Sequence, residues 1–232
     1  MKVAILGDIH GNSLALEAVL NSAKEQDVKL LLITGDLVGY YFAPDKVLEL
    51  LESWNKHMVR GNHEDMLAAV RGTPAKLAGI EKKYGSGLRI ALESLSDAQL
   101  DTLCDLPHPV ELELEGRKAL LCHGAPWDND TYVYPDADNA LLARCVHPGV
   151  DMVILGHTHY PMMREIGGTL VVNPGSVGQP RNRQPGAHWA LYDTATHTVS
   201  LRCEPYDPRP LVEESRRRHP EILFLANVLE RT

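Results

Sequence analysis

Carboxylate, amide and imidazole side chains recur at five points of the sequence, each directly after a short apolar run. Asp8 and His10 follow the run in AILGDIH, and Asp36 follows the run in LLITGD. Ligand sites of α/β folds form at the carboxyl ends of the strands, so we expect these side chains to converge on one site. The candidate metal ligands at the five points are Asp8, His10, Asp36, Asn62, His123, His157 and His159.

The chemical types at these points suit divalent transition metals. Carboxylate and amide oxygens together with imidazole nitrogens favour Mn²⁺, Fe, Zn²⁺ or Ni²⁺ over Ca²⁺ or a thiolate site. Asp8 and His10 are two residues apart, so they would face the same side of an extended segment. Taken singly, each residue has the ordinary interpretation of a turn, cap or core residue. Five clusters together favour a metal site, because a buried carboxylate without a cation is costly.

The elements that must position these residues are short strands alternating with amphipathic segments, which is typical of an α/β fold. The later strands follow one another with few helical residues between them, which indicates a partly antiparallel second half. We predict a long loop over residues 124–138. Strands are predicted at Val3–Leu6, Leu30–Thr34, His57–Arg60, Ala119–Cys122, Met152–Leu155, Leu170–Val172, Trp189–Tyr192 and Val199–Arg202. Helices are predicted at Ser13–Gln26, Pro44–Asn55, Glu64–Arg71, Asp97–Cys104 and from Pro220 to about Glu230.

The length and charge of the chain restrict its partners. It has 232 residues and a formal net charge of -8. An acidic chain lacks the clustered Lys and Arg that bind phosphate backbones, so we expect no polymeric nucleic acid partner. No stretch approaches the roughly 20 apolar residues of a membrane span, and the first apolar run stops at Asp8, too early for a secretory signal. We interpret the protein as cytoplasmic, with no membrane partner.

The whole chain is expected to form a single domain, residues 1–232, with two additions. Residues 72–95 carry Gly, Pro and Lys and are predicted to form a helical insertion. Residues 207–232 are predicted to form a C-terminal helical extension. The apolar residues of its last helix must pack either on the parent domain, which we favour, or on a second copy in a homo-oligomer.

In their order, the five motifs resemble those of the calcineurin-like metallophosphoesterase superfamily. The family pattern DxH, GD, GNH, GH and GHxH is matched here by GDIHGN, GDLVGY, RGNHE, CHG and GHTH. NPGSVGQPR at residues 173–181 resembles the small prokaryotic phosphodiesterase branch. The resemblance implies two packed mixed β-sheets flanked by helices, in a four-layer αββα sandwich.

The resemblance also implies a site for two divalent metal ions, most simply Mn²⁺, with Fe, Zn²⁺ or Ni²⁺ as alternatives. A bridging hydroxide would be the nucleophile, because metal binding lowers the pKa of water. His63 would be the catalytic residue outside the metal shell, where it could protonate the leaving group; the alternative is that it only orients other groups. Asp8, His10 and His159 would hold the first ion, Asn62, His123 and His157 would hold the second, and Asp36 would bridge both.

The implied activity is metal-dependent hydrolysis of small phosphate esters, most simply phosphodiesters such as a cyclic or linear nucleotide. One departure bears on this choice. The Ser/Thr phosphoprotein phosphatases read GDxVDRG at the second motif, whereas here Gly39 replaces an orienting Asp and Tyr40 replaces an Arg that grips phosphate. A dianionic monoester profits from such an Arg, so its absence favours a diester.

Two alternatives to a phosphodiesterase remain at this stage. One is a phosphomonoesterase, either a Ser/Thr phosphoprotein phosphatase or a dinucleoside-polyphosphate hydrolase. The other belongs to a different class, a non-catalytic metal-bearing scaffold. Because a scaffold would be expected to lose a ligand or His63, and none is lost here, we favour the enzyme.

Three further residues are candidates for substrate binding. Arg181 and Arg183 could face the phosphate, or could form a solvated basic loop. Trp127, with its neighbours Tyr132 and Tyr134, could stack on a nucleobase or an aryl leaving group, or could pack the loop onto the domain. Glu64 is expected to favour the first turn of the helix after GNH rather than to act in catalysis.

Overall fold

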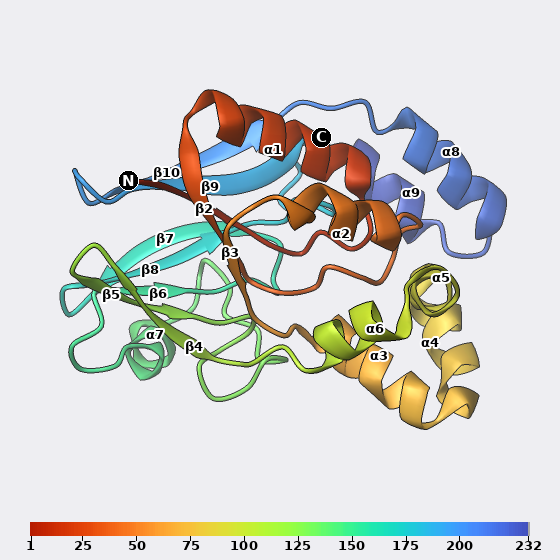
Figure 1. The fold of residues 1–232 in the computed structure, drawn as a ribbon, viewed down its shortest axis with the longest axis horizontal. Helices are drawn as coiled ribbons and strands as arrows, with labels where there is room; N and C mark the ends of the chain where they lie inside the picture. The colour runs from red at the N-terminus through yellow and green to blue at the C-terminus, as the bar shows by residue number, and fades with distance from the viewer. Residues whose placement is uncertain (232) are drawn as a thin grey trace.

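Two five-stranded β-sheets pack face to face in the computed structural model, which describes residues 1–231 (Figure 1). The first sheet contains, in spatial order, β10 (Thr198–Glu204), β9 (Ala187–Asp193), β1 (Lys2–Leu6), β2 (Val28–Ile33) and β3 (Lys56–Met58). The second contains β4 (Val110–Leu114), β5 (Arg117–Leu121), β6 (Met152–Ile154), β8 (Thr169–Pro174) and β7 (Pro161–Ile166).

Both sheets are mixed: the first pairs parallel on one side and antiparallel on the other, and the second has parallel pairs at its centre and antiparallel pairs at both edges. β1, β2 and β3 run parallel, and β9 and β10 continue this sheet in antiparallel pairing. In the second sheet, β5, β6 and β8 run parallel, while β4 and β7 pair antiparallel at the two edges. The carboxyl ends of the parallel strands are where the candidate ligands follow in the sequence.

Helices cover the outer faces of the two sheets. The helices α1 and α2 lie over the first sheet, and α7 lies on the outer face of the second (Figure 1). The helical elements are α1 (Ser13–Glu25), α2 (Pro44–Glu52), α3 (Asn62–Gly72), η1 (Pro74–Lys76), α4 (Leu77–Tyr84), α5 (Gly87–Ser94), α6 (Asp97–Cys104), α7 (Asn139–Cys145), α8 (Arg209–Arg218), α9 (Phe224–Asn227) and η2 (Val228–Glu230).

The alternation of side chains along β1 shows how the layers are held together. Ala4 and Leu6 pack outward, in a cluster that contains Leu16 of α1. Val3 and Ile5 point to the opposite face and pack against residues of the second sheet. The order of layers is therefore helices, sheet, sheet, helix. The four-layer sandwich expected from the sequence is confirmed.

Two strands were not among those predicted. β4 and β7 form the edges of the second sheet, where only one neighbour pairs with each. The β4 sequence VELEL alternates apolar with charged residues, which is the pattern of a strand with one face in water, and the short apolar runs used for the prediction do not detect it. α7 was also not predicted, whereas residues 124–138 form the expected loop.

The predicted last helix needs a correction. It was expected to begin at Pro220, but α9 begins at Phe224. Residues 219–222 form a turn, in which Ile222 N–H donates to the His219 carbonyl at 3.0 Å. The apolar side chains that follow pack on the same chain, in a cluster that contains Tyr41 and Leu225. Among the described residues, no helix has the length and apolar character that crossing a membrane requires.

Candidate metal centre

The loops that follow the parallel strands bring the candidate ligands to one edge of the sandwich. Six of these residues are buried, and Asn62, the first residue of α3, is half-buried. The remaining ligands follow strand ends: Asp8 and His10 come after β1, Asp36 after β2, His123 after β5, and His157 and His159 after β6.

Five of the seven candidate ligands have left-handed backbone conformations. For a residue other than glycine this conformation costs on the order of 1–3 kcal/mol, and it persists where the surrounding structure holds it in place. Here loop-to-loop hydrogen bonds hold it, since Asp8 N–H donates to the Gly35 carbonyl at 3.0 Å and His10 N–H donates to the Asp36 carbonyl at 2.9 Å. The φ angles are 50° at Asp8, 51° at His10, 53° at Asp36, 65° at His157 and 62° at His159.

Asp8, His10 and His159 form a first group of facing ligand atoms. One ligand atom from each lies within 4.8 Å of the other two. His159 Nε2 is 3.3 Å from Asp8 Oδ1 and 3.1 Å from His10 Nε2. Three buried donors this close to one another could hold a single cation.

Asp36, His123 and His157 form a second group within the same distance limit. His123 Nε2 lies 3.4 Å from Asp36 Oδ2 and 3.1 Å from Asn62 Oδ1. Asp36 Oδ2 is also 3.6 Å from His10 Nε2 of the first group. The Asp36 carboxylate therefore lies between the two groups.

Backbone carbonyls fix which ring nitrogen of three histidines faces the centre. Nδ1–H of His10 donates to the Val38 carbonyl at 3.1 Å. In the same way, His123 donates to Thr34 at 2.6 Å, and His159 donates to Gln179 at 2.6 Å. A carbonyl only accepts hydrogen bonds, so Nδ1 carries the proton and Nε2 presents its lone pair to the centre. This is the arrangement of metal-binding imidazoles.

Burial disfavours the charged forms of the carboxyl and imidazole side chains in the site. It raises the pKa of the Asp8 carboxyl to about 7 and lowers the pKa of His157 to about 3. Burial also lowers the pKa of His123, but the Asp36 and Asp8 carboxylates outweigh it and raise this pKa to about 10. Without a cation, the cluster must take up protons to balance its carboxylates. Divalent cations would supply that balance, so the donor set fits metal ions.

His157 supplies a second sign of fit. Its Nε2 atom is buried and has no hydrogen-bond partner among the described residues. The nearest carboxylate oxygen recorded for it is Asp130 Oδ1 at 3.4 Å, on a side chain that is 68% exposed. A buried nitrogen without a partner is unusual in a folded protein, and a metal ligand is one explanation for it.

Glu64 connects two of the ligand-bearing loops, a role that the sequence analysis missed. Its buried carboxylate accepts hydrogen bonds from the backbone N–H groups of Asp36 at 2.8 Å, Leu37 at 2.8 Å and Gly61 at 2.9 Å. The bond from Gly61 is the capping-box contact expected of a Glu at this position in a helix. The bonds to Asp36 and Leu37 cross to another loop, so the local sequence contains no signal for them.

His63 lies beside the first group and is held by packing. Its ring centroid is 4.7 Å from that of His10, 4.9 Å from that of Tyr40 and 5.2 Å from that of Tyr84. Nδ1 is buried and has no hydrogen-bond partner in the described part of the chain. It abuts Gly39, where a Cβ atom would lie 2.1 Å away. Burial lowers the pKa of the His63 imidazole.

The candidate substrate-binding residues lie in different places. Arg181 lies at the centre, where Nη2 donates to Tyr40 Oη at 3.2 Å and to Gln179 Oε1 at 3.0 Å. Burial lowers the pKa of His159, and the charge of Arg181 lowers it further. Arg183, in contrast, is exposed.

Trp127 was the third candidate, and the structure places it against another residue. Its ring is 42% exposed and lies under the Arg144 guanidinium, at 4.4 Å. The aromatic residue of this loop that reaches the centre is Tyr132, whose ring centroid is 3.9 Å from that of His157. Spacing along a loop does not reveal which of three aromatic rings turns inward.

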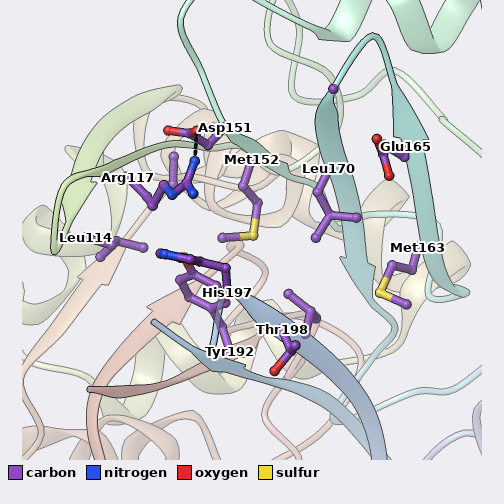
Figure 2. Close-up of a pocket in the computed structure, with 13 residues that line it drawn as sticks. Leu114, Arg117, Asp151, Met152, Met163, Glu165, Leu170, Tyr192, His197 and Thr198 are labelled. Carbon is purple, nitrogen blue, oxygen red and sulfur yellow. Dashed lines mark hydrogen bonds and ion pairs between the residues drawn. The ribbon is translucent and has the colours of Figure 1, made fainter. Parts of the chain in front are cut away.

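A separate pocket opens at the opposite edge of the sandwich, where β5, β6 and β8 begin (Figure 2). Arg117 and Asp151 form an ion pair at 2.7 Å on its wall, and Tyr192 Oη is 3.4 Å from His197 Nδ1. No candidate metal ligand lines this pocket. It is therefore distinct from the metal centre.

Comparison with known proteins agrees with this geometry. The chain is 29% identical to an uncharacterised protein of Methanocaldococcus jannaschii, over 95% of each chain. It is 25% identical to phosphodiesterase YfcE of Escherichia coli K12, over 87% of this chain and 92% of that one. A crystal structure of a hypothetical protein from Pyrococcus horikoshii superposes with a TM-score of 0.86 at 24% identity, over 98% and 97% of the two chains.

A family model extends the agreement to the motifs. Residues 1–197 match the model described as the calcineurin-like phosphoesterase superfamily domain, and this range contains all five ligand-bearing loops. The activity of this family is the metal-dependent hydrolysis of phosphoesters. The chain belongs to the calcineurin-like phosphoesterase superfamily.

Proposed function

We propose that this protein hydrolyses phosphodiesters with two divalent metal ions, most simply Mn²⁺. The observation that carries the proposal is the position of the Asp36 carboxylate, which lies 3.6 Å from His10 Nε2 in one ligand group and 3.4 Å from His123 Nε2 in the other. The ions would polarise the phosphate and lower the pKa of a water molecule. Asp8, His10 and His159 would hold one ion, Asn62, His123 and His157 would hold the other, and Asp36 would contact both.

His63 is proposed as the general acid. Because Nδ1 abuts Gly39, Nε2 is the nitrogen left to face a substrate. The ring is fixed on several sides by His10, Tyr40 and Tyr84, so Nε2 is held in one direction. A proton donated from this atom to the leaving oxygen would stabilise the departing alcohol.

Arg181 is proposed to bind the phosphate, and its surroundings favour a diester. Its guanidinium is held beside the centre by Tyr40 and Gln179. A diester carries a single negative charge, which the metal ions and one Arg can balance, whereas a monoester dianion gains from a second cationic group. Tyr40 occupies the position where phosphatases of the family carry such a group. The diester activity of the E. coli relative agrees with this choice.

The substrate is proposed to be a small cytoplasmic phosphate ester, such as a nucleotide. We also propose that residues 1–232 act as one metallophosphoesterase domain. This is supported by the way the two additions pack on the site loops. Gly87, in the insertion of residues 72–95, packs against Gly39: a Cβ atom added at Gly87 would clash with the Gly39 carbonyl oxygen. The hydroxyl of Tyr41 donates a hydrogen bond at 3.0 Å to the carbonyl of Leu225, which lies in the extension of residues 207–232.

The test compares bis-p-nitrophenyl phosphate with p-nitrophenyl phosphate on metal-free protein reloaded with Mn²⁺. We expect faster cleavage of the diester, dependent on metal and strongly reduced in His63→Ala. Faster cleavage of the monoester would replace this proposal with a phosphomonoesterase. Two bound metals without cleavage of either ester would count against an enzyme and favour a scaffold.

A further inference from the structure

The insertion of residues 72–95 reaches the catalytic centre at the end of α4. Tyr84 is the last residue of this helix, and its ring lies edge-on to His63, with centroids 5.2 Å apart. It also lies edge-on to Tyr40, at 5.6 Å. Lys83 Nζ lies 4.6 Å from the centroid of the Tyr84 ring. Lys83 is exposed, so a mobile side chain rather than a core residue covers the Tyr84 ring, and a ligand can displace it.

The C-terminal extension holds the turn that places Tyr84. Ser86 N–H donates to His219 Nε2 at 3.0 Å, and the same nitrogen is 2.8 Å from Ser86 Oγ. Gly85, with a φ angle of 80°, lies against Leu225, whose Cδ1 would be 2.8 Å from an added Cβ atom. Two segments far apart in the sequence thus meet at the residues that follow Tyr84.

A second aromatic wall stands at the other ligand group. The Tyr132 ring lies 3.9 Å from the His157 ring and stacks on Tyr134, with centroids 5.6 Å apart. Both Tyr132 and Tyr134 are more than 40% exposed. Aromatic rings therefore stand beside both ligand groups. Tyr84 is the ring next to His63, the residue proposed to protonate the leaving group.

We propose that Tyr84, together with Tyr40, forms a subsite for an aromatic leaving group, an aryl or nucleobase-bearing alcohol, and that His219 is the residue that positions it. The proposal deepens the proposed function, because a leaving group departs on the side of its proton donor. An aromatic ring gains most where other rings can stack on it or meet it edge-on. Tyr84 and His219 come from the two added segments, whereas Tyr40 ends the second motif, so the subsite would be a property of chains that have both additions.

The test measures binding rather than turnover, so that it is independent of whether the protein hydrolyses diesters. Phenylphosphonate and methylphosphonate carry the same phosphonate group and differ in the ring. Their dissociation constants are measured by isothermal titration calorimetry on Mn²⁺-loaded protein, and their ratio reports the contribution of the ring. For the unmodified protein we expect phenylphosphonate to bind about tenfold more tightly.

Variants assign this preference to residues. Tyr84→Ala should abolish it and leave the affinity for methylphosphonate unchanged, whereas Tyr84→Phe should retain it. His219→Ala should reduce the ratio, and His219→Gln, which keeps an acceptor for Ser86 N–H, should restore it. His197→Ala, in the pocket at the opposite edge of the sandwich (Figure 2), is the control and should behave as the unmodified protein.

Three results would overturn the subsite. The first is an equal affinity of the unmodified protein for the two phosphonates, or binding of neither. The second is a ratio unchanged in Tyr84→Ala. The third is an equal loss of affinity for both ligands in Tyr84→Ala, which would mean that the ring only supports the fold. If only the proposed function is wrong, the protein will not cleave diesters but will still bind phenylphosphonate more tightly than methylphosphonate.

Discussion

The imidazole of His63 fills the space that a side chain at Gly39 would need. A Cβ atom at Gly39 would lie 2.1 Å from His63 Nδ1 and 2.8 Å from its Cε1. Gly39 also has a φ angle of 110°, which other residues rarely adopt. An Asp at this position, as in the phosphatase motif GDxVDRG, would therefore displace the His63 imidazole from its present place. Packing by aromatic rings takes the place of the missing carboxylate.

Gly39→Ala is therefore expected to push His63 out of place. The added methyl group cannot coexist with the present ring position, and the three atoms nearest to it all belong to His63. We expect turnover of bis-p-nitrophenyl phosphate to fall by about 10²-fold, the lower range for loss of a general acid. Metal content, measured by elemental analysis, should stay as in the unmodified protein. Turnover within twofold of normal would show that His63 does not act from this position.

His63→Ala tests the same residue without adding bulk. We expect both metals to remain bound and diester turnover to fall by about 10²- to 10⁴-fold, because a general acid is lost and no assigned ligand is removed. The variant also tests whether His63 is itself a metal ligand, because one of its ring nitrogens lies within 4.8 Å of ligand atoms of His10 and Asp36. A loss of one metal equivalent in this variant would assign His63 to the metal shell instead.

Glu64→Gln should weaken the metal centre from outside it. The carboxylate accepts from backbone N–H groups on two loops, whereas a Gln side chain would turn its own NH₂ donors toward some of them. Leaving a buried donor without a partner costs about 1–3 kcal/mol. We expect the free energy of unfolding in urea to fall by about this amount, and metal affinity to fall by about 10- to 100-fold.

Asp65→Asn is the matched control for Glu64→Gln. Asp65 is the next residue of α3, but its side chain is 44% exposed, and its carboxylate pairs with Arg60 at 2.8 Å and accepts from Asn129 Nδ2 at 2.6 Å. Exposed ion pairs contribute about 0–1 kcal/mol. If Asp65→Asn destabilised the protein as much as Glu64→Gln, the loop-bridging role of Glu64 would be refuted.

The sequence predicted the strands at the centres of both sheets and the residues that gather at their carboxyl ends. It could do so because the strands that precede the ligand motifs contain short apolar runs, and each motif follows such a run closely. The edge strands β4 and β7 escaped prediction because one face of each meets water and their apolar residues alternate or mix with charged ones.

The parts of the site that the sequence did not reveal depend on contacts between distant segments. Tyr84 meets His63 across about twenty residues, and His219 meets Ser86 across 133 residues. Neither contact leaves a local pattern, since Tyr84 ends an ordinary amphipathic helix. Likewise, the choice of Tyr132 over Trp127 depends on the path of a loop that has no periodicity. The metal motif was recognisable because its members each keep a fixed place relative to a strand.

Asp36→Asn tests the centre of the proposed two-metal arrangement. The carboxylate faces histidines of both ligand groups, and its other oxygen, Oδ1, accepts a hydrogen bond from the backbone N–H of His63 at 2.9 Å. An amide keeps the size of the side chain but removes its negative charge, so two ions bound as proposed would lose a shared anionic ligand. We expect diester turnover to fall by about 10³-fold or more, with a fall in bound metal measured on the same sample. Normal turnover with two metals retained would mean that Asp36 does not contact both ions. The position of its carboxylate between the two ligand groups would then be a feature of the metal-free protein alone.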